Sequence, residues 1–121
     1  MIKTVIIEDE KPAARKLERM LGLIPDLEIV AVLSSVEESL DWFQNNESPQ
    51  LVFSDIMLGD GMSFDIFEKH PVQSFMIFTT AYDQYTLKAF KLNSIDYLLK
   101  PILQEDLEKA VDKFKSFLPS E

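Results

Sequence analysis

The chain has 121 residues, which fits the roughly 100–150 residues of a usual single domain. Hydrophobic residues make up 46 %, enough for a packed core, and the lack of cysteine excludes a disulfide framework or thiolate metal site. Twelve Lys and Arg against 21 Asp and Glu give a net charge of −9, which argues against direct nucleic-acid binding. No apolar stretch has the length of a membrane span or a signal peptide, so we expect a cytoplasmic domain without membrane contact.

The first half of the chain predicts three strands and two helices. The predicted strands are Lys3–Ile7, Leu27–Leu33 and Leu51–Ser54. Helical spacing of apolar residues begins at Lys11, and Pro12 suits the first turn because its missing N–H costs little there. A second helix follows Ser34 or Ser35, either of which can cap it. Glu38 is placed for a capping box if Ser35 is the cap.

The second half predicts two more strands and three helices. The strands are Phe75–Thr79 and Ile95–Leu99. The stretch "LGDG" reads as a loop, and Ser63 is expected to cap the short helix that follows it. A fourth helix carries Leu87 and Phe90 on its inner face. The last helix is amphipathic, with apolar residues from Leu107 to Leu118.

This alternation predicts the fold class. Short, near-continuous apolar strands separated by helices imply parallel pairing with both sheet faces covered. Right-handed crossovers then give an α/β, three-layer (βα)5 sandwich of the flavodoxin type, with a five-stranded parallel sheet of order 2-1-3-4-5. No linker or repeat interrupts the pattern, so residues 1–121 are expected to form a single domain.

Candidate site residues follow the strands directly, because ligands bind outside the carboxyl ends of the strands in such sheets. They are Glu8, Asp9 and Glu10 after the first strand, Asp55 after the third, Thr79 and Thr80 after the fourth, and Lys100 with Pro101 after the fifth. In the order 2-1-3-4-5 these four strands are neighbours. An acidic cluster, a hydroxyl and an ammonium group should therefore meet at one edge of the sheet.

The acidic cluster predicts a cation. Like charges ~4 Å apart repel by about 1 kcal/mol in water and several times more near a protein surface. A set of oxygen ligands suits Mg²⁺, with Mn²⁺ as a possible substitute. Asp55 could then act as a nucleophile in phosphoryl transfer, with Lys100 and the Thr80 hydroxyl on the phosphoryl oxygens. Glu10 fits a solvated charge of the first helical turn, and Asp60 fits a loop-shaping residue better than a metal ligand.

Four motifs together resemble the receiver domain of bacterial two-component response regulators. They are "IIEDE" after the first strand, "LVFSDIMLGDG" around the third, "FTTAYD" after the fourth and "SIDYLLKPI" at the fifth. The resemblance extends from Ile2 to about Leu118.

The resemblance implies a role for each site residue. Asp55 would accept a phosphoryl group from a sensor histidine kinase. The Mg²⁺ ligands would be Glu8, Asp9, Asp55 and the backbone carbonyl of Met57. Thr80 and Lys100 would bind the phosphoryl group, Tyr97 would be the switch aromatic, and Pro101 would follow Lys100 through a cis peptide bond. Such a domain is a switch rather than an enzyme.

The stretch "AYDQYTLKAFKLNSIDYLLKPI" is similar to receivers of the LytTR type, in which a DNA-binding domain follows and regulates transcription. No such domain lies within this chain, and we expect a receiver separated from its effector. A homodimer through the face of helix 4, strand 5 and helix 5 is a further expectation. Met57 and Tyr82 are bulky where the family borders the path of the hydrolytic water, so we expect slow self-dephosphorylation.

Two other functions fit parts of the pattern. The first is an Mg²⁺-dependent phosphohydrolase, but such enzymes usually place a second Asp two residues after the nucleophile, where this chain has Met57. The second is a nucleotide- or flavin-binding module of the same topology. Its glycine-rich phosphate loop is missing after the first strand, where "EDEKP" would repel a phosphate unless a metal were bound.

Overall fold

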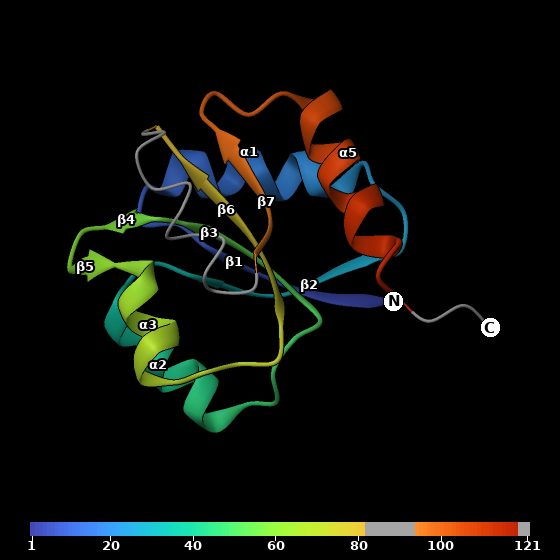
Figure 1. Cartoon of the computed structure of the whole chain (residues 1–121). Helices are drawn as coiled ribbons and strands as arrows, with labels where there is room; N and C mark the ends of the chain where they lie inside the picture. Colours follow the sequence, from blue (N-terminus) through green and yellow to red (C-terminus); the bar gives the residue numbers. More distant parts are fainter. Residues whose placement is uncertain (82–93, 119–121) are drawn as a thin grey trace.

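The computed structural model describes residues 1–81 and 94–118, which contain a five-stranded parallel sheet with helices on both faces (Figure 1). Its strands are β1 (Ile2–Ile7), β2 (Leu27–Leu33), β3 (Leu51–Asp55), β6 (Phe75–Thr80) and β7 (Ser94–Leu99). The order β2-β1-β3-β6-β7 confirms the predicted order 2-1-3-4-5. Asp55 and Thr80 are the last residues of their strands rather than the first residues after them.

Helices cover the sheet on both sides. They are α1 (Lys11–Gly22), α2 (Val36–Asn45), α3 (Ser63–Lys69) and α5 (Gln104–Lys115). Helices α1 and α5 lie on one face, and α2 and α3 lie on the other (Figure 1). The helix predicted around Leu87 and Phe90 lies outside the described residues. No helix in the described parts of the chain is long and apolar enough to span a bilayer.

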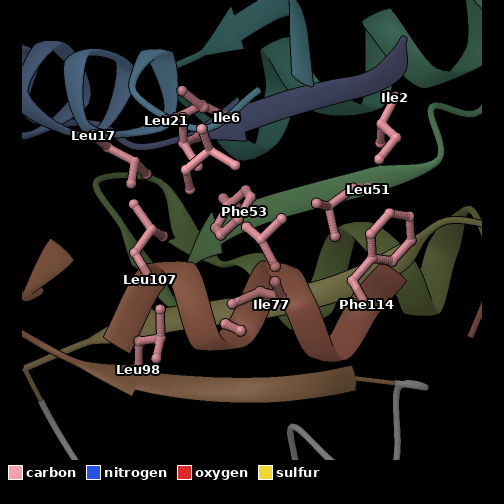
Figure 2. Packing of buried hydrophobic residues seen from close by; sticks show 13 residues of the cluster. Ile2, Ile6, Leu17, Leu21, Leu51, Phe53, Ile77, Leu98, Leu107 and Phe114 are labelled. Carbon is pink, nitrogen blue, oxygen red and sulfur yellow. The ribbon is translucent and has the colours of Figure 1, made fainter. Parts of the chain in front are cut away.

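Each face of the sheet has its own buried core. On the α1 and α5 side, Phe53 and Ile77 pack with helix residues such as Phe114 (Figure 2). On the α2 and α3 side, Val52 and Phe78 belong to the second cluster. Because successive strand residues point to opposite faces, a strand between two cores must be apolar at nearly every position. This double burial explains why the strands read as continuous apolar runs.

The strand register brings the candidate residues together. Asp55 of β3 pairs with Thr79 of β6, and Thr80 of β6 pairs with Leu99 of β7. Ile7 of β1 pairs with Ser54. The residues that follow β1, β3, β6 and β7 are therefore presented along one edge, at the carboxyl ends of parallel strands.

The cap of α2 confirms one prediction and refines it. Ser35 is the N-cap, and its Oγ accepts a hydrogen bond from the backbone N–H of Glu38 at 2.9 Å. The Glu38 carboxylate accepts from the N–H of Ser34 at 2.6 Å. In a capping box the Glu38 carboxylate would accept the N–H of the cap residue Ser35, but here it accepts the N–H of the preceding residue, Ser34.

The start of α3 differs from the prediction. Ser63 does not cap this helix but is its first residue, and Met62 occupies the N-cap position. Oδ2 of Asp65 accepts a hydrogen bond from the backbone N–H of Met62 at 3.3 Å. The preceding "LGDG" stretch is part of a small antiparallel hairpin of β4 (Met57–Leu58) and β5 (Gly61–Met62), called here the β4–β5 hairpin. The helix therefore begins one residue earlier than the preference of serine for N-cap positions predicts.

Two phenylalanines near the end of α5 test the importance of the core. Phe114 is fully buried, whereas Phe117 is 56 % exposed, and both rings contact Phe75. We predict that Phe114→Ala lowers the free energy of unfolding by about 3–5 kcal/mol, since it leaves a cavity in the core. Phe117→Ala should cost about 1 kcal/mol or less. Urea denaturation of both variants checks this, and equal losses would contradict the assigned packing.

Candidate functional site

The side chain of Lys100 joins three strands of the sheet. Its Nζ donates to Oε1 of Glu8 at 2.5 Å and to Oδ2 of Asp55 at 2.9 Å. Glu8 is only 4 % exposed and Asp55 8 %. Burying a carboxylate is costly unless it has a charged or hydrogen-bonding partner, and Lys100 supplies one to both. This ammonium therefore compensates two of the charges at the sheet edge.

Asp9 adds a third carboxylate. Glu8, Asp9 and Asp55 each offer an oxygen atom, and these atoms all lie within 4.8 Å of one another. Partial burial raises the pKa of Asp9 above its ordinary value of 3.8, and the adjacent Glu8 raises this pKa further through a hydrogen bond and its charge. The cluster thus holds more negative charge than its surroundings favour.

The pKa of Lys100 reflects the same balance. Burial alone would lower this pKa, but hydrogen bonds and charge attraction from Glu8 and Asp55 outweigh burial and raise it above its ordinary value. Lys100 is therefore an ammonium at neutral pH. Among the described residues, the Lys100 ammonium is the positive charge bonded to this group of three carboxylates, so a divalent cation fits the remaining charge, and an all-oxygen donor set fits Mg²⁺.

The two threonines at the end of β6 bond to different neighbouring segments through their backbone carbonyls. The carbonyl of Thr79 accepts the N–H of Ile56 at 3.0 Å, and the carbonyl of Thr80 accepts the N–H of Lys100 at 2.8 Å. Both side chains are almost fully buried. Thr80 thus lies beside Lys100 at the sheet edge, while the carbonyl of Thr79 helps to fix the residue that follows Asp55.

The remaining predicted residues lie around this edge. Tyr97 is partly buried in β7 and packs against the core on the α2 and α3 side. Met57, two residues after Asp55, has a 44 % exposed side chain. The peptide bond between Lys100 and Pro101 is cis. Tyr82 lies outside the described residues.

Two contacts at the site were not foreseen from the sequence. A β-carbon placed on Gly59 would lie 3.7 Å from Oδ2 of Asp9, so the β4–β5 hairpin runs close to the acidic cluster. The carboxylate of Asp60 accepts the N–H groups of Val36 and Glu37 at the start of α2. The "LGDG" stretch signals a turn, but no local pattern connects it with a helix that begins 24 residues earlier.

The raised pKa of Asp9 makes a pH-dependent prediction. Folded Asp9 holds its proton more tightly than unfolded Asp9, so its ionisation costs stability above the raised pKa and costs nothing below 3.8. Asp9→Asn should therefore raise the thermal midpoint of the metal-free protein by a few degrees at pH 7. The gain should shrink as the pH falls toward 3.8. Thermal denaturation in chelator measures this.

The exposed neighbour Glu10 provides the control, since Glu10→Gln removes an acidic charge beside the cluster and should bring no such gain. An Asp9→Asn midpoint at or below that of the wild type at pH 7 would contradict the assigned charge balance.

Comparisons with known proteins identify the family of the chain. The sequence matches the response regulator receiver domain family over residues 4–112. It is 35 % identical over 118 residues to the sensory transduction protein LytT of Bacillus anthracis, covering 95 % of this chain and 48 % of that protein. It is 39 % identical over 113 residues to LytT of Enterococcus faecalis, covering 90 % of this chain and 46 % of that protein.

A solved response regulatory domain has a similar fold. The response regulatory domain of protein mrkE from Klebsiella pneumoniae superposes with a TM-score of 0.82 at 26 % identity, covering 94 % of this chain and 95 % of that one. The chain spans about half the length of the curated relatives it matches. The family match covers most of the chain, and the resemblance inferred from the four motifs is confirmed. This chain belongs to the family of response regulator receiver domains.

Proposed function

We propose that Asp55 accepts a phosphoryl group from a sensor histidine kinase and that this event switches the domain between two states. The observation that carries the proposal is the position of Asp55 at the sheet edge, bonded to Lys100 and clustered with Glu8 and Asp9. A carboxylate held beside an ammonium and two further acids matches the needs of an aspartyl phosphate site.

The same cluster supports a metal ion. Glu8, Asp9 and Asp55, together with the backbone carbonyl of Met57, would hold Mg²⁺, for which Mn²⁺ can substitute. When bound, the ion neutralises charge on the phosphoryl oxygens. The raised pKa of Asp9 supports this assignment, because an undercompensated carboxylate gains most from a cation.

The chain's own residues would do the rest of the chemistry. A carboxylate oxygen of Asp55 attacks the phosphorus, the bond between phosphorus and the kinase histidine breaks, and that histidine leaves neutral after taking up a proton. Lys100 then exchanges its bond to the Asp55 carboxylate for one to a phosphoryl oxygen, and the Thr80 hydroxyl binds another. Mg²⁺ would bind the carboxylates of Glu8 and Asp55, which also bind Lys100, so a bound ion would weaken their hydrogen bonds to Lys100.

The conformational change that follows phosphorylation would be transmitted along β7. Phosphorylation adds a charge of roughly −1.5 to −2 to an acidic site. Movement of Thr80 toward that charge would open space for Tyr97, which packs on the α2 and α3 side of the sheet. The proposed dimer face combines β7 and α5 with the helix predicted around Leu87, which lies outside the described residues.

We further propose an output in transcription. A relative from Staphylococcus aureus, 34 % identical over 118 residues, is named transcriptional regulatory protein LytR, and this chain covers 48 % of it. Receiver domains of this family are generally switches without an enzymatic activity of their own. Self-phosphorylation from small phosphodonors and self-dephosphorylation would be the reactions of this chain, with no turnover of a separate substrate.

Incubation with acetyl phosphate and Mg²⁺ tests the proposed acceptor. Intact mass should increase by one phosphoryl group for the wild type, and Asp55→Asn should show no gain because the attacking oxygen is missing. The exposed Asp112 offers a matched control, since Asp112→Asn removes a carboxylate from α5 and should leave the mass gain unchanged. A mass gain on Asp55→Asn equal to that of the wild type would exclude Asp55 as the acceptor.

The bulky residues Met57 and Tyr82 generate a separate prediction. Replacing both with smaller or polar groups, as Met57→Asn with Tyr82→Glu, should admit the hydrolytic water and speed phosphate loss after the donor is removed. Retained phosphoprotein can be followed over time by intact mass. Equal decay rates in the wild type and the double variant would show that these side chains do not protect the phosphoryl group.

A further inference from the structure

The turn of the β4–β5 hairpin is bonded to a distant helix. Oδ1 of Asp60 accepts the N–H of Val36 at 2.8 Å, and Oδ2 accepts the N–H of Glu37 at 3.1 Å. Val36 and Glu37 are the first two residues of α2. The first N–H groups of a helix have no partner within the helix. Asp60 therefore supplies, from 24 residues away, two of the acceptors that α2 needs.

The same hairpin borders the acidic cluster. Gly59, next to Asp60, comes so close to Asp9 that an added β-carbon would lie 3.7 Å from the Asp9 carboxylate. Met57, whose carbonyl is the proposed metal ligand, is the first residue of β4 and pairs with Met62. The hairpin thus has Asp9 on one side and the start of α2 on the other.

The second strand of the hairpin is also in close contact with α2. A β-carbon placed on Gly61 would lie 3.5 Å from Cγ2 of Val36 and 3.4 Å from Oδ2 of Asp65. The φ angle of Gly61 is +146°, a conformation that other residues rarely adopt. Glycine at this position therefore permits the backbone turn that brings the Asp60 carboxylate to the start of α2.

Electrostatics favour this link. Both carboxylate oxygens of Asp60 accept backbone N–H groups at the start of α2. Hydrogen bonds from Val36 and Glu37 lower the pKa of Asp60 below its ordinary value, so the residue is ionised. The positive end of the α2 dipole favours the same charge.

From this arrangement we infer that Asp60 is a positioning residue for the metal site. By binding the start of α2, it fixes the β4–β5 hairpin, which carries Gly59 beside Asp9 and the Met57 carbonyl proposed as a metal ligand. The inference depends on the proposed function in one respect, namely that this cluster binds Mg²⁺. Linkage then requires the reverse effect, so Mg²⁺ bound at the cluster stabilises the contact between the hairpin and α2.

Ser35 provides a matched control at the same end of α2. Its Oγ accepts the N–H of Glu38 at 2.9 Å, so Ser35→Ala removes a cap from this helix but leaves the bonds of Asp60 in place. A general loosening of α2 would appear in both Ser35→Ala and Asp60→Ala. Loss of hairpin position would appear in Asp60→Ala alone.

The variant Asp60→Asn distinguishes an effect of the charge of Asp60 from an effect of its hydrogen bonds to α2. Asn caps helices about as well as Asp but carries no charge, and its single amide oxygen can accept the N–H of Val36 or of Glu37 but not both. If Asp60 acts by position, Asp60→Asn keeps much of the wild-type Mg²⁺ affinity. If Asp60 only attracts the cation through its charge, Asp60→Asn binds as weakly as Asp60→Ala.

Calorimetric titration with Mg²⁺, combined with thermal denaturation, tests the inference on the full chain. Asp60→Ala should bind Mg²⁺ about tenfold more weakly than the wild type, as for other residues that orient metal ligands. Asp60→Asn should lie between the two. Ser35→Ala should melt earlier but bind Mg²⁺ like the wild type. Wild-type affinity in Asp60→Ala, equal weakening in Asp60→Asn, or a matching loss in Ser35→Ala would overturn the inference.

Amide hydrogen exchange in the wild type adds a test that needs no variant. Mg²⁺ should slow exchange at Val36 and Glu37, whose N–H groups bond to Asp60, and unchanged exchange there would contradict the link. A wild type that binds no Mg²⁺ at all would instead overturn the proposed metal site, and this inference with it. The two failures are thus distinguished by the wild-type titration.

Discussion

The bonds from the Lys100 ammonium to Glu8 and Asp55 are the interaction on which the rest of this site depends. They join the carboxyl end of β7 to those of β1 and β3, residues separated by 92 and 45 positions in sequence. The parallel sheet with strand order β2-β1-β3-β6-β7 brings these three ends close together at one edge. The topology of the sheet thus determines which charged side chains lie together, and Lys100 reduces the repulsion between Glu8 and Asp55.

The compensation is incomplete, and this explains how a structural arrangement becomes a switch. Burial and the neighbouring Glu8 raise the pKa of Asp9, which shows that the cluster favours an additional positive charge. A rigid frame is needed to hold like charges together, and two buried cores supply it, one on each face of the sheet. In the proposed function, a cation or a phosphoryl group would change the partners of Lys100 without unfolding this frame.

Much of this could be predicted from the sequence, because periodicity and strand-end position are local signals. Continuous apolar runs such as Leu51–Ser54 indicated strands buried on both faces, and the residues after them indicated the site. What could not be predicted depends on distances in the folded chain. The preference of serine for N-cap positions led to the wrong prediction that Ser63 caps α3. The β4–β5 hairpin fixes where α3 begins, and Met62 is its N-cap. Likewise, Asp60 signalled only a turn, because its partners Val36 and Glu37 become neighbours through tertiary packing.

We propose that Lys100 and Mg²⁺ compete for the carboxylates of Glu8 and Asp55, and calorimetric Mg²⁺ titration of Lys100→Gln measures this competition. Glutamine keeps a hydrogen-bond donor near Glu8 and Asp55 but removes the positive charge that opposes a cation. At equal ionic strength and neutral pH, the variant should bind one Mg²⁺ roughly tenfold more tightly than the wild type, from the loss of a nearby like charge. Equal or weaker binding would contradict the claim that Lys100 compensates the cluster in place of a metal ion.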